Sequence, residues 1–193
     1  MNFSISKIRI EISYLFLSLI IIYIAIDRTG YIIPLLISVF IHETAHIVCL
    51  LAFSCKIKSI KLLLCTVGVE YSCAPTGVAR FMSLLCGPFS NLVISLISLS
   101  LKRDVFFGIN FLLFVYNLLP IEGLDGGEIF EMVLQKFLSH TKIIVIMDLL
   151  TLCVTIIFCV SFFAITNNFS FIILCFYILS GLVFKKTLKD KHI

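Results

Sequence analysis

Long apolar runs separated by short polar segments are the dominant pattern of this chain. Each run is close to the roughly 20 residues that a membrane-spanning helix needs. The last stretch, from 143 to 184, is too long for one span, and Thr166-Asn167-Asn168 is the obvious break within it. The pattern therefore predicts about six transmembrane helices. Their predicted bounds are 10–26, 31–53, 81–101, 105–121, 143–165 and 169–184.

The segment 55–77 does not continue this pattern. Three lysines interrupt it, it ends in Pro75-Thr76-Gly77, and its Ile, Val and Tyr residues favour β structure. We expect it to form a β-hairpin that is associated with the membrane and lies between the second and third spans. The expected fold class is thus an all-α polytopic membrane protein with one membrane-associated β-hairpin. Residues 1–193 are expected to form a single integral-membrane domain.

The composition favours lipid as the solvent of this chain. Of its 193 residues, 61% are hydrophobic and 13% are charged, whereas an ordinary soluble domain is about 45–50% apolar and about 25% charged. A soluble globule of this size would expose large apolar patches and aggregate, so a soluble enzyme is excluded. The eight cysteines include no Cys-x-x-Cys pair. We interpret them as small hydrophobic residues, with no disulfide framework and no zinc knuckle.

The distribution of Lys and Arg predicts the orientation in the membrane. With the amino terminus inside, only Arg28, Lys102 and Arg103 of the fifteen basic residues lie in outer loops. This strong positive-inside bias places both termini in the cytoplasm. The formal net charge is +4, and its basic residues lie mainly between or after apolar runs. That placement indicates membrane orientation, and no nucleic acid is expected as a partner.

Ionisable residues interrupt the second span at one point, the H-E-x-x-H sequence from His42 to His46. On a helix, residues i and i+4 lie on one face, so His42 and His46 can bind one metal ion, with Glu43 beside them as general base. A carboxylate costs a few kcal/mol at mid-membrane, so an intramembrane ionisable residue is a functional-site hypothesis by default. The alternative is a hydrogen-bonded polar patch between helices.

Catalytic zinc needs a third protein ligand and one open position. Asp125 is the best candidate, because it follows the fourth span after Pro120, which should end or kink that helix. The neighbouring glycines, Gly126 among them, allow close backbone approach. The alternative is that Asp125 caps a short amphipathic helix over 126–138, with Glu128 three residues later. The residues alone leave both interpretations open.

Three motifs in order resemble the site-2 protease family of intramembrane zinc metalloproteases, peptidase family M50. They are the H-E-x-x-H of His42–His46, the Gly-Pro-x-x-Asn of Gly87-Pro88-Phe89-Ser90-Asn91, and the Asn-x-x-Pro…Leu-Asp-Gly running from Asn117 to Gly126. The resemblance implies that Asp125 is the third zinc ligand. It also implies one Zn²⁺ per chain and zinc metalloendopeptidase activity, with Glu43 as the catalytic base.

The layout also resembles the bacterial branch that processes a sporulation sigma-factor precursor (stage IV sporulation protein FB type). That resemblance implies a membrane-associated protein substrate cut near the cytoplasmic face, membrane regulator proteins as partners, and a place in the bacterial cell membrane. Gly123 departs from the branch, which often has Pro at this position. We expect neither a CBS nor a PDZ domain.

Further motif residues have a structural and a functional interpretation. Asn117 either hydrogen-bonds the substrate backbone or developing oxyanion, or it ends a helix near Pro120. We interpret Gly87, Pro88 and Asn91 as residues that let helices pack closely and bend. Two other functions are alternatives to proteolysis: a non-catalytic membrane protein with a retained metal site, and a metal transporter.

Overall fold

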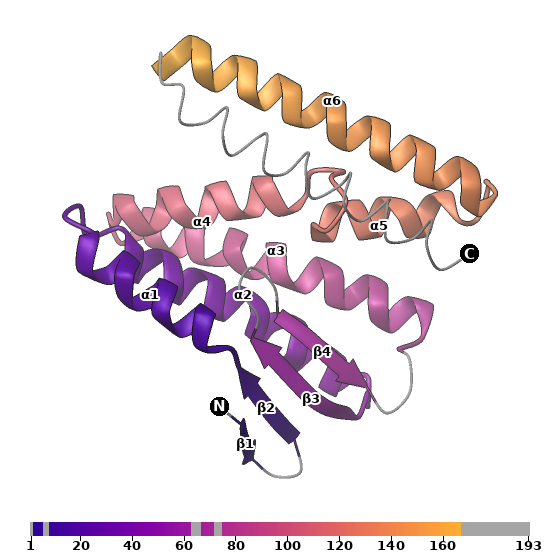
Figure 1. The fold of residues 1–193 in the computed structure, drawn as a ribbon, viewed down its shortest axis with the longest axis horizontal. Helices are drawn as coiled ribbons and strands as arrows, with labels where there is room; N and C mark the ends of the chain where they lie inside the picture. Colours follow the sequence, from indigo (N-terminus) through magenta and orange to yellow (C-terminus); the bar gives the residue numbers. More distant parts are fainter. Residues whose placement is uncertain (1, 6–7, 63–66, 72–74, 167–193) are drawn as a thin grey trace. The chain divides into compact units, whose positions relative to one another are not determined.

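The computed structural model describes residues 2–5, 8–62, 67–71 and 75–166 (Figure 1). The chain divides into two compact units, Met1–Leu118 and Leu119–Ile193. The second unit holds α5 (Asp125–Leu134) and α6 (His140–Thr166). The elements of the first unit are β1 (Asn2–Ile5), β2 (Ile8–Ile12), α1 (Tyr14–Ile26), α2 (Ile32–Ala52), β3 (Ile57–Leu62), β4 (Val67–Tyr71), α3 (Gly77–Ser100) and α4 (Asp104–Asn117).

The first unit contains a four-stranded sheet in the order β1-β2-β3-β4. Strands β1 and β2 are antiparallel, β2 and β3 are parallel with Arg9 opposite Ser59, and β3 and β4 are antiparallel. The expectation of an all-α fold with a single hairpin is therefore corrected, because β1 and β2 add two strands. The alternation Ile8-Arg9-Ile10-Glu11-Ile12 is the period-2 pattern of a strand. The expected membrane association of β3 and β4 stays a prediction.

The helices agree with a mostly helical membrane fold, but several ends differ from the expected spans. Within the described part of the chain, three helical segments are long and apolar enough to cross a membrane: Ile32–Ala52, Gly77–Ser100 and His140–Ile157. The expected first span began at Ile10, but that residue lies in β2. The helix that follows, α1, therefore begins later than expected and has only 13 residues. The expected fourth span is the 14-residue α4, which ends at Asn117. The end of α4 fits the proline that follows it. The residue before a proline avoids the helical conformation, and Pro120 lies three residues after Asn117.

Six spans are thus not established by the described residues. The expected second, third and fifth spans correspond to α2, α3 and α6, with ends shifted by one to four residues. The expected sixth span, 169–184, lies outside the described residues.

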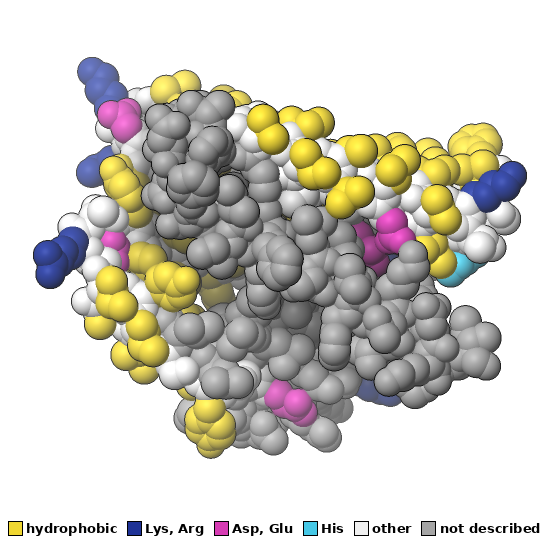
Figure 2. Space-filling view, turned by 45° about the horizontal axis from the view of Figure 1, so that its top comes forward, with side chains coloured by type: hydrophobic (Ala, Val, Ile, Leu, Met, Phe, Trp, Pro, Cys, Tyr) yellow, Lys and Arg dark blue, Asp and Glu magenta, His cyan; other side chains and the backbone are white. Residues whose placement is uncertain are grey.

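Among the described residues, ten polar side chains are buried and many large apolar side chains are exposed, which is the reverse of a water-soluble protein. The fully buried side chains of largest volume include Asn91, Asn110 and Thr151. In contrast, Val145 of α6 is 63% exposed and Leu112 of α4 is 68% exposed. Figure 2 shows hydrophobic side chains gathered on the surface of the described residues. A surface of this kind suits contact with lipid tails.

Helix α3 packs against both α2 and α4 within the first unit (Figure 1). Its buried face consists of small or polar residues, which allow close approach of helices in membranes. Thr76 caps the helix, since its side chain accepts a hydrogen bond from the Ala79 N–H. The buried residues of α3 are Ala79, Ser83, Gly87, Pro88, Asn91, Ser95 and Ser98.

Candidate metal centre

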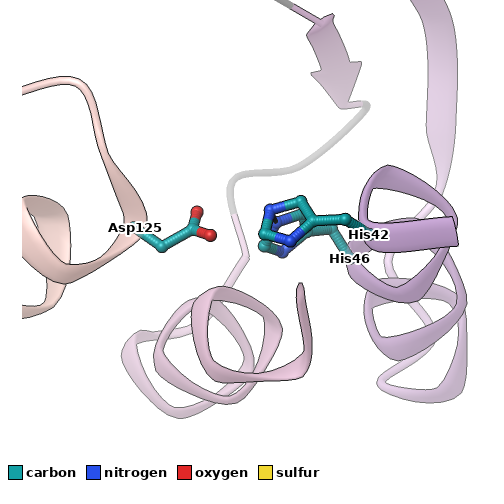
Figure 3. A group of neighbouring side chains, drawn as sticks. All are labelled: His42, His46 and Asp125. Carbon is teal, nitrogen blue, oxygen red and sulfur yellow. Dashed lines mark hydrogen bonds between the residues drawn. The ribbon is translucent and has the colours of Figure 1, made fainter. Parts of the chain in front are cut away.

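The two histidines of α2 converge at one point. His42 and His46 lie one helical turn apart, and their Nε2 atoms are 3.0 Å from each other. Their rings meet edge to face with centroids 4.7 Å apart. Figure 3 shows the two side chains alongside one another. Two imidazole nitrogens on a tetrahedral zinc ion would be about 3.3 Å apart. The pair is therefore already close to the spacing that one metal ion requires.

A backbone carbonyl of α3 holds the His46 ring. The Nδ1 of His46 donates to the Ser83 carbonyl oxygen at 2.7 Å, and the Ser83 hydroxyl donates to the His46 carbonyl at 3.3 Å. Because a carbonyl can only accept, the proton of the neutral ring is on Nδ1. That leaves the lone pair on Nε2, the atom that faces His42. Hydrogen bonding at the other ring nitrogen is the usual way in which proteins orient a metal-binding histidine.

Asn91 of α3 contacts the other histidine. Its Nδ2 lies 3.2 Å from Nδ1 of His42, and the Asn91 side chain is fully buried. From the sequence, Asn91 was expected only to help helices pack closely and bend, and its contact with His42 was not predicted. Its signal was the amide side chain one turn after Gly87 in a strongly apolar helix, which needs a hydrogen-bonding partner.

Gly87 provides the space in which the rings lie. A Cβ at this position would lie 2.8 Å from Cε1 of His42 and closer still to the imidazole of His46. Both rings therefore pack directly against the α3 backbone. The expected packing role of Gly87 is specific: it accommodates the two imidazoles. Pro88, the next residue, is buried within the same helix.

We expect Gly87→Ala to weaken zinc binding by about 10- to 100-fold, the effect seen when ligands lose their supporting contacts. The added methyl group must displace the two imidazoles from Ser83 and Asn91. Gly108→Ala is the matched control, because a Cβ on this α4 glycine meets nothing within 4 Å. Competition with a chromophoric chelator measures the affinity, and thermal unfolding separates loss of the site from loss of the fold. Equal zinc affinity in the two variants would contradict this packing.

Glu43 is the only carboxylate within α2. It follows His42 directly and is half-buried. The next residue, Thr44, is bonded within its own helix, where its hydroxyl donates to the Phe40 carbonyl at 2.7 Å. Thr44 therefore has a local role, whereas Glu43 is the carboxylate that α2 offers as a base.

Asp125 begins α5 in the second unit. The N-cap of this helix is Leu124, whose backbone is extended, and no side chain caps it. Asp125 is thus the first helical residue, one position after the N-cap that the alternative assigned to it. Figure 3 shows the carboxylate projecting from the helix start. A negative charge in the first turn also interacts favourably with the helix dipole. The helix ends at Leu134, four residues before the predicted end at 138.

The turn before Asp125 is held within the second unit. The backbone N–H of Glu122 donates to the hydroxyl of Thr151, a fully buried residue of α6, at 3.0 Å. A Cβ on Gly127 would lie 2.7 Å from the backbone carbon of Ile121. Gly126, the glycine expected from the sequence to allow close approach, is also buried. The roles of Gly127 and Thr151 were not predicted. Both residues show their role only through contacts with residues elsewhere in the sequence, six residues away for Gly127 and 29 residues away for Thr151.

The departure at Gly123 has a conformational reason. Its φ is +92°, a value in the left-handed region that glycine adopts without strain. Proline is restricted to a φ near −65°. The turn as this chain forms it therefore requires glycine where the resembling branch often has proline.

Asn117 is the last residue of α4, and its Nδ2 donates to the Leu113 carbonyl at 3.0 Å. This bond fits the helix-ending alternative from the sequence. The contribution of Asn117 to substrate or oxyanion binding stays a prediction.

Comparison with known proteins gives the fold. This chain is similar in structure to a Site-2 Protease from Methanocaldococcus jannaschii, with a TM-score of 0.65 and 22% sequence identity. The match covers 94% of this chain and 93% of the other. No protein-family model and no curated protein sequence matches the chain. The two structures share a fold, and this fold spans nearly the full length of both.

Proposed function

We propose that this chain is a zinc-dependent intramembrane endopeptidase of the site-2 protease family. The observation that carries the proposal is the His42–His46 pair, with Nε2 atoms 3.0 Å apart on a helix of membrane-spanning length and composition. Glu43 lies beside this pair in the sequence, which completes the H-E-x-x-H pattern of zinc peptidases. The shared fold with a Site-2 Protease supports the same assignment.

The proposed ligands are His42, His46 and Asp125, each of which offers one ligand atom. Two imidazole nitrogens and one carboxylate oxygen are a donor set that suits catalytic zinc and leaves a fourth position open. The hydrogen bond of His46 fits this assignment, because a proton on Nδ1 leaves the lone pair on Nε2 for a metal ion. Gly87 fits it as well, because a side chain at this position would collide with both imidazoles. A zinc ion held there would supply a water nucleophile near neutral pH and polarise the scissile carbonyl.

In this mechanism Glu43 moves the protons. Its carboxylate takes a proton from the attacking water and later delivers one to the amine leaving group. Ser83 and Asn91 keep the imidazoles oriented while this happens. Asn117 remains a candidate for holding the substrate backbone.

The proposed substrate is a membrane-associated protein cut near the cytoplasmic face, of which a sporulation sigma-factor precursor is the proposed example. The resemblance to the sporulation branch supports this choice, together with membrane regulators as partners and a bacterial cell membrane with both termini inside. The sheet order supports a way to hold the substrate, because β4 lies at one edge of the sheet that the structure describes. An extended peptide can pair with such an edge through its backbone.

Cleavage of defined transmembrane peptides tests the proposed function. The full chain, purified in detergent, is incubated with a mixture of synthetic single-span peptides in ¹⁸O-labelled water. We expect mass spectrometry to show one ¹⁸O atom at each new carboxyl terminus. A chelator should stop the reaction and added zinc should restore it. Cleavage that continues without zinc would contradict the mechanism, and no cleavage of the mixture would favour the non-catalytic alternative.

A further inference from the structure

A cavity of about 460 Å³ lies at one end of the first unit. Gly30 and Pro34 form one wall, and the five residues from Lys102 to Phe106 form the other. The loop between α1 and α2 and the turn between α3 and α4 therefore meet here, at the left end in Figure 1. Pro34 precedes His42 by eight residues, which is about 12 Å along α2. The cavity is thus a separate site from the histidine pair.

The cavity lies where two helices of membrane-spanning length end. Helix α2 begins at Ile32 and α3 ends at Ser100, and both are long and apolar enough to cross a bilayer. The 21 residues of α2 extend over about 32 Å, close to the roughly 30 Å of the hydrocarbon layer. The ends of such helices lie at the level of the lipid headgroups. Lipid phosphates are therefore the anions that this cavity meets at high local concentration.

Two cationic side chains line the cavity. Lys102 and Arg103 are exposed, and within the described part of the chain no ion pair neutralises either of them. Asp104 also lines the cavity, so the three side chains leave one net positive charge. Figure 2 shows Lys and Arg side chains close to acidic ones at the left end of the view. A ligand with one net negative charge would balance this charge.

The backbone of Lys102 is strained. Its φ is +52°, in the left-handed region that glycine usually occupies just after a helix end. The N–H of Arg103 donates to the Ser98 carbonyl at 2.8 Å, and the N–H of Lys102 donates to the Leu99 carbonyl at 3.1 Å. Glycine would form this Schellman turn without strain. A lysine in a strained backbone position indicates that its side chain has a use there.

Asp27 holds the loop that carries the facing wall. Its Oδ1 accepts from the N–H groups of Thr29 and Gly30 and from the Thr29 hydroxyl, and its Oδ2 accepts from the N–H of Ile32. These hydrogen bonds, that of the Thr29 hydroxyl first, hold the pKa of Asp27 below its usual value. Both carboxylate oxygens are thus used within the loop, which leaves Lys102 and Arg103 available to a ligand.

We propose that this cavity binds the headgroup of an anionic phospholipid whose headgroup carries hydroxyls, the chemistry of phosphatidylglycerol. Lys102 and Arg103 bind the phosphate through charge-assisted hydrogen bonds, and Asp104 accepts a hydrogen bond from a headgroup hydroxyl. Pro34 and Phe106 provide apolar contacts for the lipid below its phosphate. The bound lipid joins the α1–α2 loop to the α3–α4 turn and so stabilises the first unit. The inference goes beyond the proposed function and does not depend on zinc.

Lipid binding by the full chain in detergent tests the proposal. Native mass spectrometry measures bound lipid, and thermal unfolding measures the stabilisation, with phosphatidylglycerol and phosphatidylcholine of the same acyl chains. We expect phosphatidylglycerol to bind more tightly and to raise the unfolding temperature more. Lys102→Gln with Arg103→Gln should weaken its binding by about 10- to 30-fold. Lys136→Gln with Lys142→Gln is the matched control, because these exposed lysines flank the turn between α5 and α6 and should leave the binding unchanged.

Lys102→Gly separates binding from folding. Glycine relieves the left-handed backbone, so we expect the lipid-free chain to be at least as stable, while phosphatidylglycerol binds more weakly. Lys102→Arg, which keeps the charge, should retain binding. Equal affinity of the unsubstituted chain for the two lipids would overturn the proposal, and so would unchanged phosphatidylglycerol binding after loss of both cations. Stabilisation by inorganic phosphate as large as that by phosphatidylglycerol would also overturn it, because the cavity would then bind a free anion.

Discussion

Glu43→Gln is expected to abolish peptide hydrolysis while zinc stays bound. Glutamine preserves the size of the side chain but cannot take a proton from water. General-base catalysis contributes about 10²- to 10⁴-fold to a rate, so we expect a loss of that order in the cleavage of the transmembrane peptides. Glu43 is not among the proposed ligands, which is why zinc content should not change.

The matched control for Glu43→Gln is Thr44→Val, the next residue of α2. The hydroxyl of Thr44 donates to the Phe40 carbonyl of its own helix. We expect Thr44→Val to retain both zinc and most of the activity. Hydrolysis by Glu43→Gln at the rate of the unsubstituted chain would exclude Glu43 as the base. Loss of zinc in that variant would instead mean that Glu43 helps to hold the metal.

Asp125→Ala is expected to weaken zinc binding by more than about 100-fold, which is beyond the 10- to 100-fold range for supporting residues. A hundredfold change corresponds to about 2.7 kcal/mol. The physical reason is that the substitution removes one of three proposed ligands. Affinity is measured by chelator competition on the full chain in detergent, with peptide cleavage as the second readout.

Glu128→Ala separates a ligand role for Asp125 from a helix-terminus role. Both residues are acidic and lie in the first turn of α5. A charge near a helix N-terminus stabilises by about 0.3–1 kcal/mol, so a dipole role would make the two substitutions similar and leave zinc affinity intact. We expect Glu128→Ala to bind zinc normally. Equal affinity in both variants would remove Asp125 from the ligand set.

The candidate metal-binding residues could be found in the sequence because they are ionisable and their neighbours are apolar. His42, Glu43 and His46 interrupt an apolar run, and ionisable residues there are costly enough to need a reason. Helical spacing then predicted that both histidines share one face, and the structure brings their Nε2 atoms to 3.0 Å. The sequence also predicted a helix over 31–53, where α2 runs from Ile32 to Ala52.

The sheet was only partly predictable, because its pairing is not local. Strand β2 is parallel to β3, and Arg9 lies opposite Ser59 across α1 and α2. No local pattern identifies a partner fifty residues away. In addition, the three isoleucines of β2 run almost directly into the apolar residues of α1. Hydropathy alone therefore extended the first predicted span into the strand.

Supporting residues were missed because their side-chain types do not reveal their partners. Asn91 and Thr151 are polar residues in apolar helices. This indicates that each forms a hydrogen bond, but it does not identify the partner. The structure shows that Asn91 contacts His42 and that Thr151 holds the turn before Asp125. What distinguishes Gly127 is the backbone of Ile121 that approaches it, which the sequence does not show.

The most direct test of the central claim is the first coordination shell of zinc in the purified full chain, measured by X-ray absorption. We predict about one zinc per chain, bound by nitrogen and oxygen at about 2.0–2.2 Å, with the scattering of two imidazoles and no sulfur. A shell containing sulfur at about 2.3 Å would assign the metal to cysteines and contradict the account. A chain that retains no zinc at a stoichiometric supply would contradict it equally.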